Sequence, residues 1–530
     1  MTAPECTRLS TIEVSSQPHR KHLLGRTLTA FERVVARLRW PIHTVLVRLD
    51  LRTMAAFSLP FTLYVLTLAP TIYNLDSAEL TTAAYTGGLM RATGYPLYLV
   101  LGHFWSRLPL GDVGYRMNLF SAFMGALTIA LSDRILRRWR VGPWAAFGAL
   151  GLLATAPFFW GMSLVAEVYT LQTALMASLI LALLRWGESP TPRRLALVGL
   201  LGGLSMGHHM STVLLVPGSL LYVMTTAPRL FFSRRSLLAV ALGTLAGLSI
   251  YLYLPLRYAA QPVFNYAGTY DETLNFIPVN LQTFAGLWWL VTGKAFGNQM
   301  LAYHGLDLLR EIGHFAAQLG QAFFAVGIGP GVLGLILLFR RSWREASMLA
   351  LMFCFSAAFY VDYRVIDKAT MFLPAYVIWA LWVGIGFQEL LIWLRGASNA
   401  QGDLKTMQVM RTAMVAIVLL AVAWNWRLVD LSHDWSARQR AEAVLRNVRP
   451  NALVFGWWDM APVLQYLQLV EGQRTDVRVI NRFLIAPADL NRLIEKEVRY
   501  RPIYIDSPPN DLLMTMEAEP VGPVFRLVPQ

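Results

Sequence analysis

Long apolar segments alternate with short polar segments along most of the chain. Most of them approach the ~20 residues that a helix needs to cross a bilayer. The pattern predicts an all-α polytopic membrane protein with about eleven transmembrane helices. The predicted segments are Ala55–Tyr73, Tyr115–Asp133, Pro143–Gly161, Thr170–Trp186, Leu195–Gly207, Ser211–Thr226, Ser236–Leu256, Gln321–Phe339, Ala346–Val361, Ala369–Leu394 and Met410–Leu428.

Arginine-rich clusters occupy alternate connections between these segments. About eleven crossings place every dense cluster on one side, which the positive-inside rule identifies as the cytoplasm. The loop after the first segment, the segment 257–320 and the whole tail then lie on the extracytoplasmic side. Besides the N-terminus, the clusters are Arg134–Arg140, Arg185–Arg194, Arg229–Arg235, Arg340–Arg344 and Arg395–Arg411.

The two ends of the chain differ from the apolar middle. In the basic N-terminal part, 1–54, Leu23–Leu38 has helical periodicity and predicts a helix on the cytoplasmic leaflet or, alternatively, a solvated helix. The middle, 55–428, is the predicted transmembrane domain. In 429–530 short helices alternate with short strands, which predicts a small extracytoplasmic α/β domain.

Composition supports a membrane protein and narrows the alternatives. The chain is 55% hydrophobic and 15% charged, with a formal net charge of +14. Because the cations sit in clusters between apolar segments, membrane topology explains the charge better than nucleic-acid binding, so we expect no nucleic-acid partner. The two cysteines form neither a disulfide framework nor a metal-binding set.

The loop after the first apolar segment holds Asp76 and Glu79. Acidic residues at a membrane boundary are candidate functional groups, because burying them there is costly. Asp76 is interpreted either as the N-cap of a capping box with Glu79, or as a general base that takes a proton from an attacking hydroxyl. The two interpretations are compatible, because a capping carboxylate can also face a cleft.

Cations on the same predicted side give this base a possible partner. Arg91, Arg257, Arg364 and Lys368 are all placed there by the topology. A guanidinium such as that of Arg257 can hold a phosphate in bidentate geometry. Arg257 is otherwise an interfacial anchor, and Arg364 and Lys368 otherwise pair with their loop's own aspartates.

Two further pairs of residues face the same side. Glu167 and Tyr169 share a short turn, where a helix cap is the simpler interpretation of Glu167. His208 and His209 are adjacent, so they point to different faces of a helix, which favours hydrogen bonding over metal binding. The tryptophans, including Trp457-Trp458, are predicted to be interfacial or core residues.

Six motifs in order carry a resemblance to a known family. DSAEL, GYPLY, AEVYTL, GLSMGHHMS, YLYLPLR and DYRVIDKATMFLP resemble, in this order, the family that includes transmembrane protein 260, a protein O-mannosyltransferase. That family belongs to the GT-C superfamily of membrane glycosyltransferases. The tail segment WWDMAPVLQYLQLVEGQRTDVRVIN resembles bacterial members, and the match covers roughly residues 55–505.

The resemblance implies a GT-C fold, a polyprenyl-phosphate sugar donor and no essential metal. It also implies an acidic catalytic residue in the first outer loop, which falls here on Asp76 with Glu79 beside it. Tyr95 lies in the GYPLY motif and joins the substrate-binding candidates. The family commonly has His-Pro-Pro or His-Pro-Thr before Gly-Tyr-Pro, whereas this chain has Arg91-Ala92-Thr93.

The expected function is therefore transfer of a sugar, mannose being one possibility, to a protein or glycan hydroxyl at the outer face of a bacterial plasma membrane. Asp76 is the expected base, and inversion at the anomeric carbon the expected outcome. Arg257, Arg364, Lys368, Tyr95, Glu167, Tyr169, His208 and His209 are the substrate-binding candidates. A lipid-linked sugar flippase or transporter, or a non-catalytic scaffold, remains the alternative.

Overall fold

A computed structural model describes residues 50–365, 367–396 and 403–530 of this chain. The chain divides into two compact units, Met1–Leu51 and Arg52–Gln530. The helix predicted at Leu23–Leu38 lies outside the described residues. The predicted transmembrane segments and the tail belong to the second unit.

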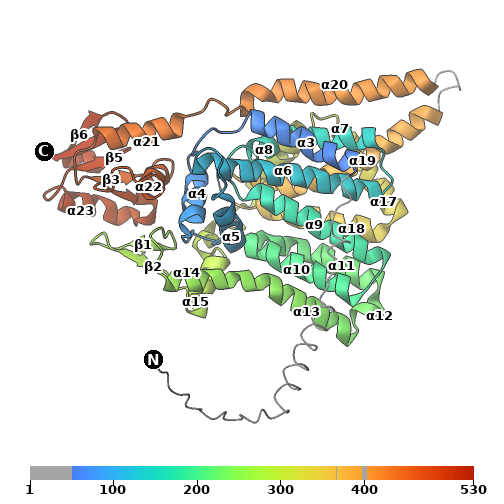
Figure 1. The fold of residues 1–530 in the computed structure, drawn as a ribbon, viewed down its shortest axis with the longest axis horizontal. Coiled ribbons are helices and arrows are strands. Elements are labelled where there is room, and N and C mark those ends of the chain that lie inside the picture. The colour runs from blue at the N-terminus through green and yellow to red at the C-terminus, as the bar shows by residue number, and fades with distance from the viewer. Residues whose placement is uncertain (1–49, 366, 397–402) are drawn as a thin grey trace, which may run out of the picture. The chain divides into compact units, whose positions relative to one another are not determined.

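Six of the described helical segments are long and apolar enough to cross a membrane by length and composition. They identify the chain as an integral, multi-pass membrane protein. Figure 1 shows them running side by side with the shorter helices. They are α6 (Val113–Arg138), α9 (Tyr169–Glu188), the continuous run α13 (Arg234–Leu248), η2 (Ser249–Leu252) and α14 (Tyr253–Ala259), α18 (Trp343–Val361), η4 (Lys368–Phe372) with α19 (Leu373–Gly396), and α20 (Asp403–Val429).

Each remaining predicted segment contains a shorter helix, and how many of these cross the membrane stays a prediction. Several begin at proline, whose fixed φ suits the first helical turn. The segment predicted at Gln321–Phe339 starts too early, because Phe324 and Ala325 adopt positive φ and interrupt the helix there. The shorter helices are α3 (Leu51–Leu66), α7 (Pro143–Ala154), α8 (Pro157–Gly161), α10 (Pro192–His208), η1 (Met210–Leu215), α11 (Val216–Thr226), α12 (Pro228–Phe231) and α17 (Ile328–Arg341).

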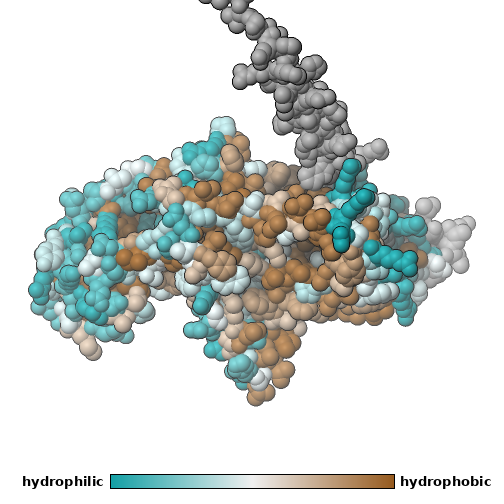
Figure 2. Space-filling model, turned by 90° about the horizontal axis from the view of Figure 1, so that it is seen from below, coloured by the Kyte–Doolittle hydropathy of each residue, from teal (hydrophilic) through white to brown (hydrophobic). Residues whose placement is uncertain are grey.

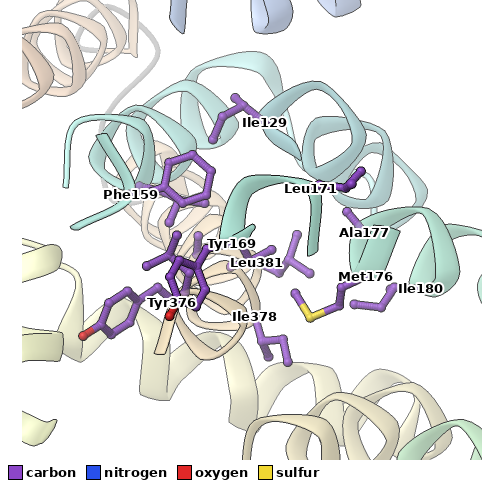
Figure 3. Packing of buried hydrophobic residues seen from close by; sticks show 14 of the residues in the cluster. Ile129, Phe159, Tyr169, Leu171, Met176, Ala177, Ile180, Tyr376, Ile378 and Leu381 are labelled. Atoms are coloured by element: carbon purple, nitrogen blue, oxygen red, sulfur yellow. The ribbon is translucent and has the colours of Figure 1, made fainter. Parts of the chain in front are cut away.

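Close packing of apolar side chains joins these helices. Figure 3 shows Ile129 of α6, Phe159 of α8, Met176 of α9 and Leu381 of α19 converging in one buried cluster. Helix α19 is buried over most of its length, which explains its almost continuous apolar sequence. Figure 2 shows hydrophobic side chains spread over the helical part, whereas hydrophilic ones gather over the C-terminal domain.

Two segments outside these helices form the region around Asp76: the acidic loop itself and the segment 257–320. The loop itself folds into α4 (Asp76–Thr86), followed by α5 (Pro96–Trp105). The segment 257–320, in which no helix or strand was predicted, contains a small antiparallel hairpin and an amphipathic helix. Its elements are β1 (Gly268–Tyr270), β2 (Phe276–Pro278), α15 (Phe284–Val291), η3 (Lys294–Gln299) and α16 (Gly305–Ala322).

The tail folds as the predicted α/β domain. Its sheet has the order β4-β3-β5-β7-β6, with the first three strands parallel and the last two antiparallel. The alternation of short helices and strands predicted the three α-helices and the first three strands, but neither the short 3₁₀ helices nor the final hairpin. The elements are α21 (Ser436–Asn447), β3 (Leu453–Gly456), α22 (Ala461–Leu469), β4 (Arg478–Asn481), η5 (Arg482–Leu484), α23 (Pro487–Glu497), β5 (Ile503–Ile505), η6 (Leu512–Met514), β6 (Met516–Val521) and β7 (Val524–Pro529).

The C-terminal domain packs against the acidic helix. Helix α22 lies beside α4 (Figure 1), and Ala78 of α4 belongs to the same buried cluster as Leu464 of α22. The hydroxyl of Tyr466 accepts a hydrogen bond from the N–H of Gly114, at 3.2 Å. Residues far apart in sequence therefore share one apolar contact at the candidate site.

Candidate functional site

Asp76 begins helix α4 but does not cap it. The residue before the helix is Leu75, at φ 55°, and no side chain caps the helix N-terminus. The capping-box interpretation is therefore wrong. The carboxylate of Asp76 is 38% exposed and points to other side chains, so its hydrogen bonds are not spent on the backbone of its own helix.

Two side chains converge on a single oxygen of Asp76. Nη2 of Arg91 lies 2.5 Å from Oδ1, and Nε1 of Trp458 donates to the same atom at 2.8 Å. The guanidinium of Arg91 also stacks on the Trp458 ring, 3.9 Å from its centroid, a cation–π contact. The three side chains form a compact cluster, which we call the Asp76 cluster.

Glu79 lies one turn further along α4 and is fully buried. Its Oε1 accepts a hydrogen bond from the backbone N–H of Arg91 at 3.3 Å, and its Oε2 lies 3.4 Å from Nε of the same residue. Burial raises the pKa of Glu79 to about 8, although the charge of Arg91 opposes the shift. Glu79 therefore holds Arg91 from behind, while Asp76 meets it at the exposed side.

A hydrogen bond between the residue before Glu167 and the residue after Asp76 brings Glu167 next to the Asp76 cluster. The hydroxyl of Ser77 accepts a hydrogen bond from the N–H of Ala166 at 3.1 Å. Burial raises the pKa of Glu167, and the charge of Asp76 raises it further. Burial raises the pKa of Asp367 too, and the charge of Asp76 adds to this shift. Asp76 and Glu79 thus contact Arg91 directly, and Glu167 and Asp367 lie near enough to Asp76 to be affected by its charge.

Tyr95, Tyr169, His208 and His209 lie at the same end of the helices. Tyr95, at φ 43°, precedes α5, and its ring lies 5.6 Å from that of His209. His208 contacts the carbonyl of Val168 through Nε2 at 2.8 Å. The structure thus brings together the GYPLY, AEVYTL and HHM motifs.

Arg257 does not lie in the Asp76 cluster. Its Nε donates to the carbonyl of Gly87 at 2.6 Å and its Nη2 to that of Thr86 at 3.5 Å. These carbonyls end α4, whereas Asp76 begins it, about 16 Å away along a helix of this length. The cation that meets the candidate base is Arg91. The expectation that Arg257 clamps a phosphate beside Asp76 finds no support in this arrangement.

Arg364 and Lys368 form a second group with residues of the 300–311 segment. Nη2 of Arg364 donates to the carbonyl of Ala302 at 2.7 Å, and both cations lie over the ring of Tyr303. Lys368 pairs with Glu311 of α16. In the part of the chain that the structure describes, the ion-pair and aromatic partners of these cations are therefore residues of this segment and not the aspartates of their own loop.

No group of three or more His, Cys, Asp or Glu side chains is placed to hold a metal ion among the residues that the structure describes. Metal independence itself stays a prediction.

Comparison with known proteins finds similarity to one family. The model of the "Protein O-mannosyl-transferase TMEM260 N-terminal domain" matches residues 76–230, which begin at Asp76. The chain is 22% identical over 459 residues to the mouse protein O-mannosyl-transferase TMEM260, and 21% identical over 460 residues to its Dictyostelium discoideum counterpart. The chain is thus similar to the TMEM260 proteins, in agreement with the resemblance of its motifs.

These alignments cover 81% and 79% of this chain, but only 62% and 55% of the mouse and Dictyostelium proteins. This TMEM260-like chain therefore spans little more than half the length of the curated relatives that it matches. Their whole length includes parts without a counterpart in the alignment.

Solved structures confirm the GT-C fold of this TMEM260-like protein. ArnT from Cupriavidus metallidurans in the apo state superimposes with a TM-score of 0.56 at 14% identity, covering 90% of this chain and 96% of ArnT. ArnT bound to undecaprenyl phosphate gives a TM-score of 0.57 at 13% identity, covering 90% and 97%.

Trp458 is the residue of the site that sequence reasoning missed. Trp457-Trp458 predicted interfacial or core residues, and Trp458 is indeed buried, but its indole N–H binds the candidate base. Phe483 and Tyr266 pack against the same indole ring, at 4.9 and 5.6 Å between centroids. The one available signal was WWDM inside the family-like part of the tail.

Proposed function

We propose that this protein is a membrane glycosyltransferase that moves a sugar, mannose in the first instance, from a polyprenyl-phosphate donor to a hydroxyl acceptor. The acceptor is a protein Ser or Thr, or a glycan. The reaction takes place at the extracytoplasmic face of a bacterial plasma membrane, with the N-terminus in the cytoplasm, and requires no metal. The curated relatives that support the reaction are eukaryotic.

The Asp76 cluster is the observation that carries the proposal. Both described hydrogen bonds to the carboxylate use Oδ1, which leaves Oδ2 to accept a proton. The side chain is partly exposed, whereas that of Glu79 is buried. A carboxylate oriented by two donors and still reachable suits a general base. Glu79 supports the base by fixing Arg91.

The mechanism follows from this arrangement. Asp76 takes the proton of the acceptor hydroxyl while the acceptor oxygen forms a bond to the anomeric carbon. The bond from that carbon to the phosphate oxygen breaks on the opposite side, and polyprenyl phosphate leaves with the electron pair, so the anomeric centre inverts. A cation stabilises the phosphate charge as it develops, which makes a second acidic residue unnecessary. Arg91 takes this role in place of Arg257.

ArnT has been solved with undecaprenyl phosphate bound, and this supports a lipid-linked donor for a chain of the same fold. Arg364 and Lys368 belong to a separate cationic group, and we assign them to the donor's phosphate as it approaches from the membrane. Tyr95, Tyr169, His208 and His209 line the helix ends beside Glu167 and are assigned to substrate contacts.

Incubation of the purified protein with radiolabelled polyprenyl-phosphate mannose tests the proposal. The expected result is label on an added protein or glycan acceptor together with release of polyprenyl phosphate. Label moved across a vesicle bilayer without bond cleavage would identify a flippase instead. No consumption and no movement of the donor would leave a scaffold role.

A further inference from the structure

A cavity of about 790 Å³ opens beside the candidate site. The segment 258–282 forms one wall, and α22 with β4 forms the other. Tyr266 closes its inner side: the ring lies 5.6 Å from that of Trp458, whose N–H binds Asp76. One aromatic layer therefore separates this cavity from the candidate base.

The wall formed by β4 is the edge of the five-stranded sheet. The N–H of Arg478 donates to the carbonyl of Ala452, on the β3 side. Because successive residues of a strand direct their peptide groups to opposite edges, those of Val477 and Val479 face outward. Both residues line the cavity. The N–H of Val477 donates to the carbonyl of Arg474 at 3.1 Å, so the N–H that pairs with an added strand is that of Val479. An open strand edge can pair with an extended chain.

Side-chain amides now occupy part of that edge. Nε2 of Gln465 donates to the carbonyl of Val479 at 3.2 Å, and Nε2 of Gln468 donates to that of Val477 at 2.7 Å. An amide N–H is also the donor that an adjoining polypeptide strand supplies. The two glutamine side chains thus occupy the positions at which the N–H groups of an added strand would donate.

The rest of the lining favours a polypeptide over an anionic glycolipid. Phe264 and Phe276 offer apolar contacts for side chains. Among the described residues that line the cavity the only cation is Arg478, and its guanidinium donates to the carbonyl of Leu274. A phosphorylated acceptor would require more positive charge than this.

We propose that the cavity binds the acceptor as an extended polypeptide, which pairs with the outer edge of β4 and passes Tyr266 toward Asp76. This inference rests on the proposed function and adds to it the place where a polypeptide acceptor binds. The glutamine side chains give way to the N–H groups of the acceptor strand.

Peptide binding without turnover tests the inference separately from catalysis. The probe is a pool of fluorescein-labelled peptides about twelve residues long, roughly 40 Å when extended, with a central Ser or Thr and otherwise randomised positions. Binding is measured by anisotropy with the full-length Asp76→Asn protein in lipid nanodiscs, so no transfer is required. Thr475→Trp fills the exposed rim of the cavity. Glu517→Trp, on β6 at the other edge of the sheet, is the matched control.

We expect Thr475→Trp to weaken peptide binding at least about tenfold, and Glu517→Trp to leave it unchanged. Val479→Pro removes the outward N–H without breaking the β3 ladder and should weaken binding as well. The inference would be overturned if the peptides bound equally well with and without Thr475→Trp. It would also be overturned if a soluble neutral oligosaccharide displaced the labelled peptides as well as unlabelled peptide does. If peptide binding depends on the cavity but the protein with native Asp76 transfers no sugar, the binding site is upheld and the proposed function is refuted.

Discussion

At the residue scale, the candidate chemistry depends on one carboxylate. Replacing Asp76 with Asn keeps the size of the side chain but removes its ability to accept a proton. We expect transfer to fall by about 10²- to 10⁴-fold, with expression and thermal stability nearly unchanged. Sugar transfer from the labelled donor measures the effect. Asp307→Asn, at an exposed position on α16, is the control, and a wild-type rate in Asp76→Asn would remove this residue from the role.

Trp458 orients that carboxylate and supports Arg91. Trp458→Phe keeps a ring under the guanidinium but loses the N–H that binds Asp76, so its activity should fall moderately, by about tenfold for one hydrogen bond to a charged group. Trp458→Ala also loses the cation–π contact and should be less active still. Trp457→Ala, half-exposed and one residue away, is the control. Equal activity of Trp458→Phe and Trp458→Ala would show that the ring contributes nothing.

Glu79 makes stability depend on pH. Its pKa rises from 4.5 to about 8 on folding, so between these values the folded state binds more protons than the unfolded state. Stability should therefore fall as the pH rises from about 4.5 to 8. Unfolding temperatures measured in detergent at about pH 5 and pH 8.5 should differ more for the wild type than for Glu79→Gln. Glu517→Gln is an exposed control, and parallel curves for the wild type and Glu79→Gln would contradict the prediction.

At the element scale, Arg257 is a C-terminal partner of α4. Gly87 follows this helix at φ 65°, and a Cβ there would lie 3.1 Å from the guanidinium of Arg257, so glycine suits both the turn and the close approach. Because Arg257→Ala removes donors to the last carbonyls, we expect a loss of ~1 kcal/mol in stability. Thermal unfolding measures it.

Donor binding distinguishes this role from the phosphate clamp first expected. The Michaelis constant for the labelled donor should change little in Arg257→Ala and rise markedly in Arg91→Ala. A large rise for Arg257→Ala at unchanged stability would restore the phosphate role. Arg229→Ala, on α12, serves as a control for loss of a cation.

At the scale of the whole molecule, the C-terminal domain is part of the site. Arg438 joins Glu471 of this domain to Asp112 before α6, at 2.7 and 3.3 Å. Arg438→Ala leaves these carboxylates without their shared partner and should lower stability by ~1 kcal/mol or more, and lower transfer in parallel. Unfolding temperature and transfer rate are the measurements. Arg440→Ala, whose partner Asp459 lies within the domain, should change both less.

Much of the fold followed from local sequence patterns. The length of the apolar segments predicted helices, and each predicted segment contains one, because helix formation in lipid depends mainly on local composition. Alternating short elements predicted the tail domain as far as β5. The hairpin β6–β7 was missed because polar or exposed residues interrupt its apolar pattern, namely Glu517, Glu519, Pro520, Arg526 and Pro529. In the segment 257–320, α16 was missed because a helix with one polar face lacks a continuous apolar run.

The sequence by itself determined the class of protein, the resemblance to a family and the acidic loop that holds Asp76, because these depend on composition, order and motifs, which can be recognised without knowledge of tertiary contacts. The tertiary structure alone decided which cation meets Asp76. The sequence pattern did not distinguish Arg91, Arg257, Arg364 and Lys368, whereas tertiary contacts gave each a different partner. Trp458 lies 382 residues from Asp76, and a contact over that separation depends on how the C-terminal domain packs, which no local pattern encodes.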